Sequence, residues 1–403
     1  MKTYPRTQAI GCVFAALVMT AFMPDAQADA ITDWNVVSAG IVSEAKIGTP
    51  PAIRVMAIVQ TAAHEAVLAA GSAPARATAD AAVAAAHRAA FAALLPAQAA
   101  SVDAAYRAAL EPIVDGADKR AGIALGERAA AAVLARRAAD LKMPAEAYRP
   151  HAAPGVYVPT ALPAVPQWPA RQPWLMRDPA QFRPAPPPAL DSAAWARDFN
   201  EVKAMGGKQS ARRSAEQTEV ARFWEYSLPA IYHGVVRSVA AQPGRDLAGN
   251  ARLFAAVAQA MDDAMIAVAD AKYHYHFWRP VTAIRNGDAD GNDATERDAT
   301  WVSFIDAPMH PEYPSAHSVL AGAVGSVLAA EVGAGPMPEL STSSPTAQGA
   351  TRRWTRLEDF LQEVANARVW EGIHYRSSTE VGTALGRQVG ELAVQRLQLA
   401  SNR

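Results

Sequence analysis

The sequence has a single cysteine, Cys12, among its 403 residues. Cys12 lies inside an apolar stretch near the N-terminus, so a mature protein without that stretch would contain no cysteine. Disulfide bonds and thiol catalysis are therefore excluded from the mature protein. A lipid anchor on Cys12 is also excluded, because too little apolar sequence precedes it.

The chain also lacks a strong net charge. Its formal charge is −1, with 38 Lys and Arg against 39 Asp and Glu, and no long basic run occurs. This balance argues against nucleic acid or an anionic membrane as the main partner, while a small anionic ligand stays open. Hydrophobic residues make up 51% of the chain, so it is able to bury a large core as one sizeable domain or two smaller ones.

The N-terminus has the pattern of a secretory signal peptide. Lys2 and Arg6 precede an apolar stretch at about 9–22, and Ala26-Gln27-Ala28 forms a small-x-small cleavage site. The apolar stretch is shorter than the roughly 20 residues that span a bilayer. No later stretch reaches spanning length without charge. The sequence therefore predicts a signal peptide over 1–28 and an exported protein, periplasmic or secreted, with no membrane span after cleavage.

Convincing strand alternation is absent, whereas helical spacing of apolar residues is frequent. In the N-terminal half Gly71 and Gly116 mark breaks between Ala-rich helices, and Thr49 is the expected cap of the first helix. These helices are predicted at residues 49–70, 77–94, 97–113 and 118–141. Small alanine side chains would let them approach closely as an antiparallel bundle.

Prolines crowd the segment 143–190, which also contains several aromatic residues such as Trp168 and Trp174. Proline excludes a regular helix, but the tryptophans imply packing, so this segment is expected to be an ordered wrap over the bundles and not a free linker.

A second helical set follows the Pro-rich segment, with Asp191 as a plausible cap of its first helix. Its helices are predicted at residues 191–205, 215–226, 229–241, 246–278, 315–332, 356–370 and 378–398. The predicted class is all-α, with an N-terminal bundle at 29–142, the connecting segment at 143–190 and a C-terminal bundle at 191–403.

Lys272 and Arg279 are the first of three clusters of candidate site residues. They lie seven residues apart, two turns of a helix, so both cations can point from one face toward one ligand. Pro280 is expected to end or kink that helix. Two cations on a helical face are usually solvated, but the aromatic residues between these two indicate a buried helix end, where unpaired cations would be costly.

The second cluster is Pro314-Ser315-Ala316-His317, which precedes an apolar run at 319–330. Ser315 is therefore expected to start a helix whose free backbone N–H groups face an anion, and its hydroxyl would bond the same ligand. His317 would lie in the first turn, where the helix dipole lowers the pKa of an imidazole. The alternative is a simple serine cap with a surface histidine.

The third cluster is Arg368 near the end of one helix and His374 just past Gly372. Together the clusters supply three fixed cations, two imidazoles and a helix-starting hydroxyl, a set suited to a tetrahedral or trigonal-bipyramidal oxyanion. Their order, Lys-x6-Arg-Pro, Pro-Ser-x-His and Arg-x5-His, resembles the vanadium-dependent haloperoxidases and the type 2 phosphatidic acid phosphatases. In that superfamily the three motifs build an oxyanion pocket inside a helical bundle. Residues 272–280 and 311–315 look most like the bacterial exported haloperoxidase-like branch, and the resemblance covers nearly the whole mature chain.

The resemblance implies vanadate as the cofactor, with His374 as the nitrogen ligand of vanadium. His317 would act as acid and base toward hydrogen peroxide, and Lys272 would polarise the bound peroxide so that a halide leaves as hypohalous acid. The residues implied to bind the oxyanion are Lys272, Arg279, Ser315, Ala316 and Arg368.

His310 stands where bromoperoxidases of this family carry His and chloroperoxidases carry Phe. By resemblance it is a candidate for tuning the halide preference, and the alternative is a surface histidine in a Pro-flanked loop.

Two positions depart from the family pattern. Ala316 stands where Gly is usual, so its methyl would shift the backbone N–H or narrow the pocket. Ser378 stands where the family often has Asp, which in the phosphatases orients the nucleophilic imidazole. A metal ligand needs only a fixed tautomer, which Ser378 or a carbonyl would supply, so this departure weakens the phosphohistidine mechanism more than the vanadate one. An acid phosphatase acting on phosphate esters through His374 and a catalytically silent anion-binding protein stay as alternatives, and a homo-oligomer is possible.

Overall fold

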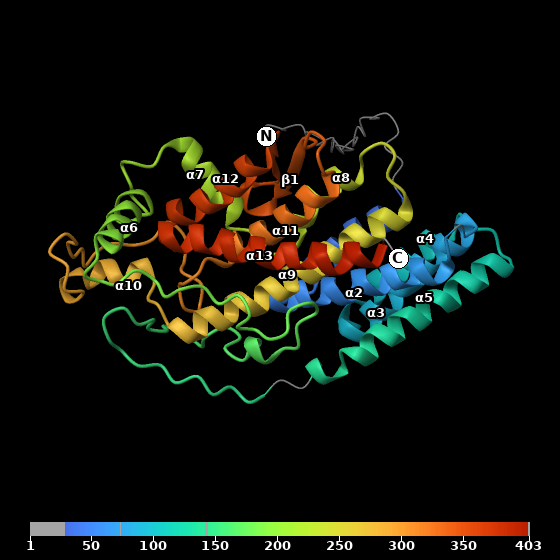
Figure 1. Ribbon diagram of the computed structural model, residues 1–403, viewed down its shortest axis with the longest axis horizontal. Helices are drawn as coiled ribbons and strands as arrows, with labels where there is room; N and C mark the ends of the chain where they lie inside the picture. Colours follow the sequence, from blue (N-terminus) through green and yellow to red (C-terminus); the bar gives the residue numbers. More distant parts are fainter. Residues whose placement is uncertain (1–28, 73, 142–143, 402–403) are drawn as a thin grey trace, which may run out of the picture.

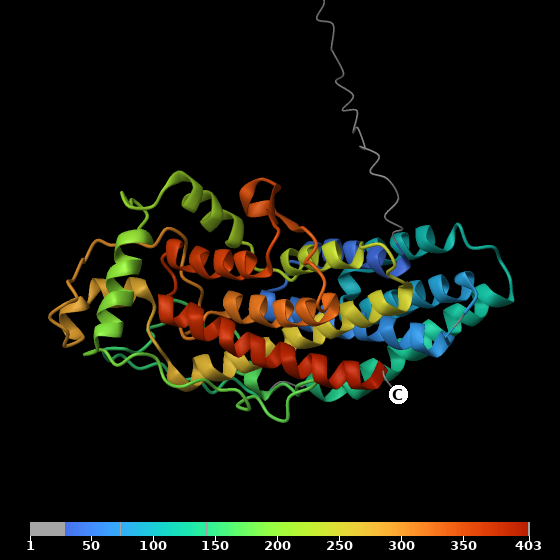
Figure 2. The same ribbon diagram turned by 45° about the horizontal axis from the view of Figure 1, so that its top comes forward.

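The computed structural model describes residues 29–72, 74–141 and 144–401. The predicted signal peptide and Cys12 lie outside the described residues. The described chain is predominantly helical, which confirms the predicted class. The long helix α9 (Leu247–Tyr275) runs through the middle of the molecule, between the helices of the N-terminal half and those that follow it in sequence (Figures 1 and 2).

The helices predicted in the N-terminal half are present with small shifts of their ends. The helices of this half are α1 (Ala30–Glu44), α2 (Thr49–Ala70), α3 (Arg76–Leu94), α4 (Ala99–Leu110) and α5 (Ala117–Arg136). The sequence analysis did not predict α1, which Asp29 caps by accepting a hydrogen bond from the Thr32 N–H. The predicted cap of α2 was wrong: Gly48 is the N-cap, and the Thr49 hydroxyl bonds Ser227 instead.

Close approach of the Ala-rich helices is confirmed where α3 meets α5. A Cβ on Gly126 of α5 would overlap the backbone of Ala82 on α3. Glycine is therefore required at this crossing, because any larger residue would push the two helices apart.

The C-terminal half follows the predicted helices with two differences. Its helices are α6 (Ala193–Met205), α7 (Ala215–Trp224), α8 (Ala230–Ala240), α9, α10 (Pro280–Arg285), α11 (Ala316–Val332), α12 (Leu357–Trp370) and α13 (Arg376–Ser401). Ser192, and not Asp191, caps α6 by accepting from the Trp195 N–H. The short helix α10 was not predicted.

A β-hairpin corrects the expectation that the chain has no strands. Strands β1 (Leu340–Ser344) and β2 (Ala350–Trp354) pair antiparallel, with Leu340 opposite Trp354. The inward positions of β1 include Thr342 and Ser344, which are small and polar. The hydrophobic alternation that marks a half-buried strand is therefore missing from the sequence, although the burial alternates.

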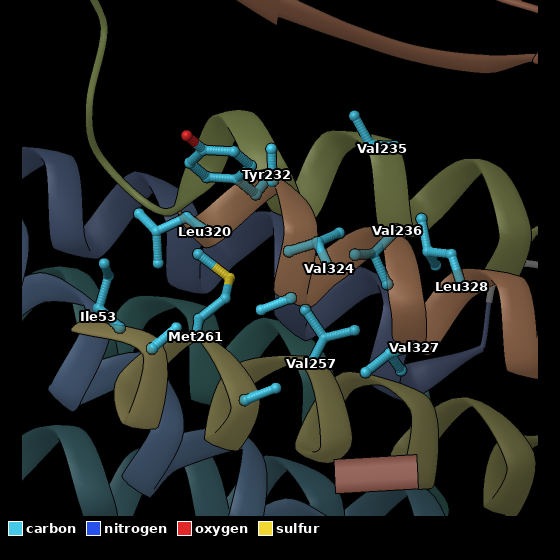
Figure 3. Close-up of a cluster of buried hydrophobic side chains, with 14 of the residues drawn as sticks. Ile53, Tyr232, Val235, Val236, Val257, Met261, Leu320, Val324, Val327 and Leu328 are labelled. Atoms are coloured by element: carbon cyan, nitrogen blue, oxygen red, sulfur yellow. The ribbon is translucent and has the colours of Figure 1, made fainter. Parts of the chain in front are cut away.

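One hydrophobic core joins the two halves of the chain. Side chains from α2, α8, α9 and α11 meet in it, as Figure 3 shows for Ile53, Tyr232, Met261 and Leu320. A second core lies within the N-terminal helices. The predicted domain boundaries stay a prediction, since the larger core contains residues from the N-terminal and the C-terminal half of the chain.

Helix α2 is, among the described residues, the one helix long and apolar enough to cross a membrane. Its most apolar window is 78% buried inside the protein, and it packs against α3, α5 and α9.

The Pro-rich segment forms an ordered wrap, as predicted, and runs in extended form along one side of the molecule (Figure 1). Trp168 and Met176 are buried in the core. Asp263 on α9 accepts hydrogen bonds from the backbone N–H groups of residues 174, 175 and 176 at 2.6, 2.8 and 2.9 Å. A buried carboxylate therefore fastens the wrap to the central helix.

Candidate active site

The predicted site residues come together around one cavity of about 580 Å³. They arrive from the end of α9, the start of α10, the start of α11, the end of α12 and the connection to α13. The predicted residues that line the cavity are Lys272, His310, Ala316, His317, Arg368 and His374. Arg279 and Ser315 lie directly behind this wall, since Arg279 contacts His374 and Ser315 is the N-cap of α11.

The sequence analysis placed Arg279 on the wrong helix. Lys272 and Arg279 do not share a helical face, because α9 ends at Tyr275 and His276 takes a left-handed conformation with φ 52°. The His276 N–H closes the helix on the Lys272 carbonyl. Arg279 is instead the N-cap residue of α10, and Pro280 begins that helix rather than ending α9.

Lys272 is held by backbone carbonyls and not by a carboxylate. Its ammonium donates to the carbonyls of Pro311 and Glu312 at 3.0 and 2.6 Å. Burial, followed by the repulsion of Arg279, lowers the pKa of Lys272 well below its ordinary value. Since two N–H groups are used by carbonyls, the third is available to a ligand in the cavity.

Arg279 is fixed by backbone carbonyls from two separate segments. Its Nε donates to the His310 carbonyl at 3.0 Å and its Nη1 donates to the Ile373 carbonyl at 2.8 Å. Nη1 also lies 3.3 Å from Nε2 of His374. Burial lowers the pKa of Arg279 to about 10, so the guanidinium stays charged at neutral pH.

Arg368 is paired with a buried carboxylate that the sequence analysis did not identify. Its Nη1 donates to the Trp224 carbonyl and to Oε1 of Glu371, both at 2.7 Å. Glu371 has no exposed surface, and burial raises its pKa to about 8, although Arg368 opposes this shift. Within the described residues Nε of Arg368 is buried without a hydrogen-bond partner.

The orienting partner of His374 is Glu312. Oε1 of Glu312 lies 2.6 Å from Nδ1 of His374 and also accepts the Tyr375 N–H at 3.1 Å. Ser378, the predicted candidate, is 3.5 Å from the same Nδ1. A carboxylate on Nδ1 fixes the tautomer in which Nδ1 carries the proton, so Nε2 carries the lone pair, which Nη1 of Arg279 approaches at 3.3 Å.

Sequence reasoning missed Glu312 because it lies in a different motif from His374, 62 residues earlier. The available signal was an acidic residue inside the aromatic and proline-rich stretch before Ser315, where an unpaired carboxylate would be costly. Glu312 has no exposed surface, and burial raises its pKa to about 7.

Ser315 is the N-cap of α11, as predicted, and its hydroxyl accepts from the Ser318 N–H at 3.5 Å. His317 in the first turn is 8% exposed, which rules out the surface alternative. Burial first and the charge of Arg368 second hold the pKa of His317 well below its ordinary value. The imidazole is therefore neutral, and desolvation is the first cause of the shift; a contribution from the helix dipole stays a prediction.

His310 belongs to the site. Its Nδ1 lies 3.0 Å from Nη2 of Arg279, and its side chain lines the cavity. The alternative of a surface histidine is wrong, while an effect on halide preference stays a prediction.

Two close contacts at glycines set the distances between the segments that carry the site residues. Gly372, with φ 78°, lies against Gly206, and a Cβ on either residue would overlap the other's backbone. A Cβ on Gly386 of α13 would likewise overlap the carbonyl of Val319 on α11. Close packing of α11 on α13 brings the Ser315 end of one helix near the His374 end of the other.

Comparisons with known proteins agree with this geometry. The family described as the VCPO second helical-bundle domain matches residues 252–403. The vanadium chloroperoxidase of Curvularia inaequalis is 34% identical over 148 residues, which is 30% of this chain and 24% of that protein. In its C-terminal part the chain is similar to the vanadium-dependent haloperoxidases. It spans only about a quarter of the length of this curated relative.

Solved structures of the superfamily share the fold of nearly the whole chain. A bacterial vanadium-dependent iodoperoxidase superposes with a TM-score of 0.74 at 24% identity, covering 91% of this chain and 95% of that one. The apo and holo forms of a bacterial vanadium-dependent chloroperoxidase both give a TM-score of 0.69, at 19% and 20% identity. They cover 86% and 87% of this chain, and 92% and 93% of theirs.

The residues present fit the oxyanion that binds in this superfamily. Vanadate needs one nitrogen lone pair and several cationic donors, and the cavity is lined by His374, whose Nε2 carries the lone pair, and by the basic residues Lys272 and Arg368. Over the described ranges no group of three or more His, Cys, Asp or Glu is arranged to hold a metal cation.

Proposed function

We propose that the protein is a vanadate-dependent haloperoxidase that oxidises a halide with hydrogen peroxide to hypohalous acid. The observation that carries the proposal is the pairing of His374 with Glu312, which presents Nε2 of a buried neutral imidazole among three buried cations. We also propose that the protein acts outside the cytoplasm, after export through the segment at 1–28.

In this proposal His374 would hold the vanadate and the cations would hold its oxygens. Bound vanadate would activate hydrogen peroxide for attack by the halide. Lys272, Arg279 and Arg368 would neutralise the anion from fixed positions, so little reorganisation is needed during the reaction. Ala316 keeps its backbone N–H at the start of α11, where the family pattern has Gly.

His317 would take the proton of hydrogen peroxide. A base must be neutral at the working pH, and the lowered pKa of His317 keeps it so. Its Nε2 lies 3.4 Å from the Tyr226 carbonyl, which would hold the proton of the neutral ring on Nε2 and leave the lone pair on Nδ1.

A second candidate function, an acid phosphatase acting through a phosphorylated His374, gains support from Glu312. The sequence analysis discounted it because Ser378 replaces the orienting Asp, but Glu312 supplies the missing carboxylate at 2.6 Å. The same geometry thus suits a nucleophilic imidazole.

One preparation separates the two functions. Oxidation of bromide or iodide by peroxide is measured before and after vanadate loading, and hydrolysis of an aryl phosphate is measured without vanadate. We expect halide oxidation only after loading, little hydrolysis, and loss of halide oxidation in His374→Ala. Halide oxidation that does not depend on vanadate would contradict the haloperoxidase proposal, and vanadate-inhibited hydrolysis abolished by His374→Ala would favour the phosphatase.

A further inference from the structure

A second pocket lies between α8 and the β-hairpin. Helix α8 packs against β1 (Figure 1), and the pocket beside this contact measures about 470 Å³. This volume falls within the range of about 300–1,000 Å³ that is usual for small-molecule sites. In the part of the chain that the structure describes, the pocket shares no lining residue with the active cavity. It is therefore a separate candidate site.

Of the described residues that line this pocket, Arg237 on α8 is the one that carries a charge. Its Nη1 donates to Oδ1 of Asn35 at 2.8 Å, and Asn35 is fully buried. The Asn35 side chain is held in turn by His233, whose Nδ1 lies 2.7 Å from Nδ2 of Asn35. One edge of the guanidinium is therefore fixed by a rigid but neutral partner.

The other edge of the guanidinium is open. Within the described ranges neither Nε nor Nη2 of Arg237 has a hydrogen-bond partner, and neither atom is enclosed by protein. Burial lowers the pKa of Arg237, with no contribution from a carboxylate. A partly buried cation that no carboxylate compensates favours an anionic ligand, because such a ligand restores the missing counter-charge.

The two open nitrogens suit a carboxylate group. Nε and Nη2 lie along one edge of the planar guanidinium, so they are able to donate to both oxygens of one carboxylate. Arg183 uses the same two nitrogens to bind the Asp270 carboxylate, at 2.7 and 2.8 Å. A single cation also matches the one charge of a carboxylate better than the charge of about −2 on a phosphate monoester.

The hydroxyl groups of the pocket wall suit a ligand that has hydroxyl groups of its own. Ser343 and Thr351 are partners across the hairpin, and their hydroxyl oxygens lie 2.8 Å apart. The Tyr226 hydroxyl lies 3.1 Å from the hydroxyl of Ser43. In each pair one hydroxyl donates to the other, so the accepting hydroxyl keeps its own proton for a ligand oxygen.

We propose that this pocket binds a sugar acid, a polyhydroxylated monocarboxylate, with its carboxylate on Nε and Nη2 of Arg237 and its hydroxyl groups against the hairpin. The pocket contains none of the predicted oxyanion-binding residues, so the proposed site does not depend on the haloperoxidase function.

Binding of D-glucuronate to the full chain, measured by a ligand-observed NMR titration without vanadate, halide or peroxide, tests the site. Arg237→Gln removes the charged donors, and Thr351→Asp places a carboxylate in the pocket at an exposed position. We expect saturable binding by the unaltered protein and at least about tenfold weaker binding by each variant. Arg353→Gln is the matched control, because it removes the same charge from an exposed ion pair of β2 that does not line the pocket.

Two smaller probes test the two halves of the ligand. D-Glucose lacks the carboxylate and acetate lacks the hydroxyl groups, so each should bind at least about tenfold more weakly than D-glucuronate. Binding of D-glucose or acetate as tight as that of D-glucuronate would overturn the assignment of a sugar acid.

Binding that both pocket variants weaken and that Arg353→Gln leaves unchanged supports the site. Absence of saturable binding, or unaltered binding by both pocket variants, overturns it. Binding that is lost in Arg368→Gln and kept in Arg237→Gln also overturns it, because the carboxylate then lies in the active cavity. Thermal melting followed by circular dichroism confirms that each variant is folded, and the exposed Thr351→Asp keeps the test decisive if Arg237→Gln is not.

Discussion

The substitution Glu312→Gln tests the central feature of the site, the carboxylate that orients His374. Gln keeps the shape of the side chain and removes its charge. The native pair is a charge-assisted contact of 2.6 Å between two fully buried groups, the kind that contributes about 1.5–3 kcal/mol. Changes to such orienting partners typically cost about 10- to 100-fold in metal affinity or activity.

Two effects of Glu312→Gln oppose each other, and a comparison of two anions separates them. Above pH 7, where Glu312 is ionised, loss of its negative charge behind the oxyanion-binding residues favours every anion. Loss of the fixed tautomer penalises only a ligand that needs the lone pair on Nε2 of His374. Phosphate held by the cations should therefore bind equally well or more tightly, whereas vanadate should bind more weakly. We expect the ratio of the vanadate Kd to the phosphate Kd to rise by about 10- to 100-fold.

The measurement is a titration of the purified protein with each anion by isothermal calorimetry, with vanadate-dependent iodide oxidation as a second readout. Ser378→Ala is the comparison variant, since its hydroxyl is 3.5 Å from Nδ1 of His374 and also bonds Glu312; it leaves the carboxylate in place and should change the ratio by less than about threefold. A ratio in Glu312→Gln within about twofold of the native value would refute the orienting role. A melting temperature close to the native one ensures that the comparison concerns folded protein.

Other predictions follow from the buried carboxylates and from His317. Above pH 8, where Glu371 is ionised, Glu371→Gln leaves the buried charge of Arg368 uncompensated, so the free energy of unfolding in urea should fall by about 3 kcal/mol and recover partly with phosphate; a loss below about 1 kcal/mol would contradict this. Burial raises the pKa of Asp263 from 3.8 to about 6, so the folded state binds its proton more tightly than the unfolded chain. The resulting stability is present below pH 3.8 and is lost as the pH rises through 6. Urea unfolding at several pH values should show this fall flattened in Asp263→Asn, with Asp270→Asn, which breaks a partly buried ion pair, as control. His317→Ala should lower kcat for iodide oxidation by about 10²- to 10⁴-fold without abolishing vanadate binding, and full turnover would exclude the acid–base role.

The sequence predicted most of the residues around the cavity, because each of the three motifs is short and local. Lys272, Ser315 and Arg368 lie on helices whose spacing and caps are visible in the chain, and the structure places them beside one cavity. Helix ends were predicted less well. His276 terminates α9 three residues early through a left-handed backbone conformation, which a non-glycine residue seldom adopts and which no local pattern announces.

Partners far apart in sequence could not be predicted at all. Ser378 was chosen as the partner of His374 because it is four residues away, yet the contact at 2.6 Å comes from Glu312 in another motif. The sequence likewise left open whether His310 was at the surface, and only its contact with Arg279 places it in the site. Both contacts depend on how α10, α11 and α13 pack.

The sequence by itself determined the helical class, the order of the three motifs and the kinds of group that form the anion cage, because periodicity, caps and residue chemistry are local properties. Only the tertiary structure decided which carboxylate orients which side chain, and which apolar residues share the cavity with the cations. Those relations arise from close helix packing at contacts such as Gly386 against Val319. A shift of about one ångström there would change every distance in the site without changing any local pattern.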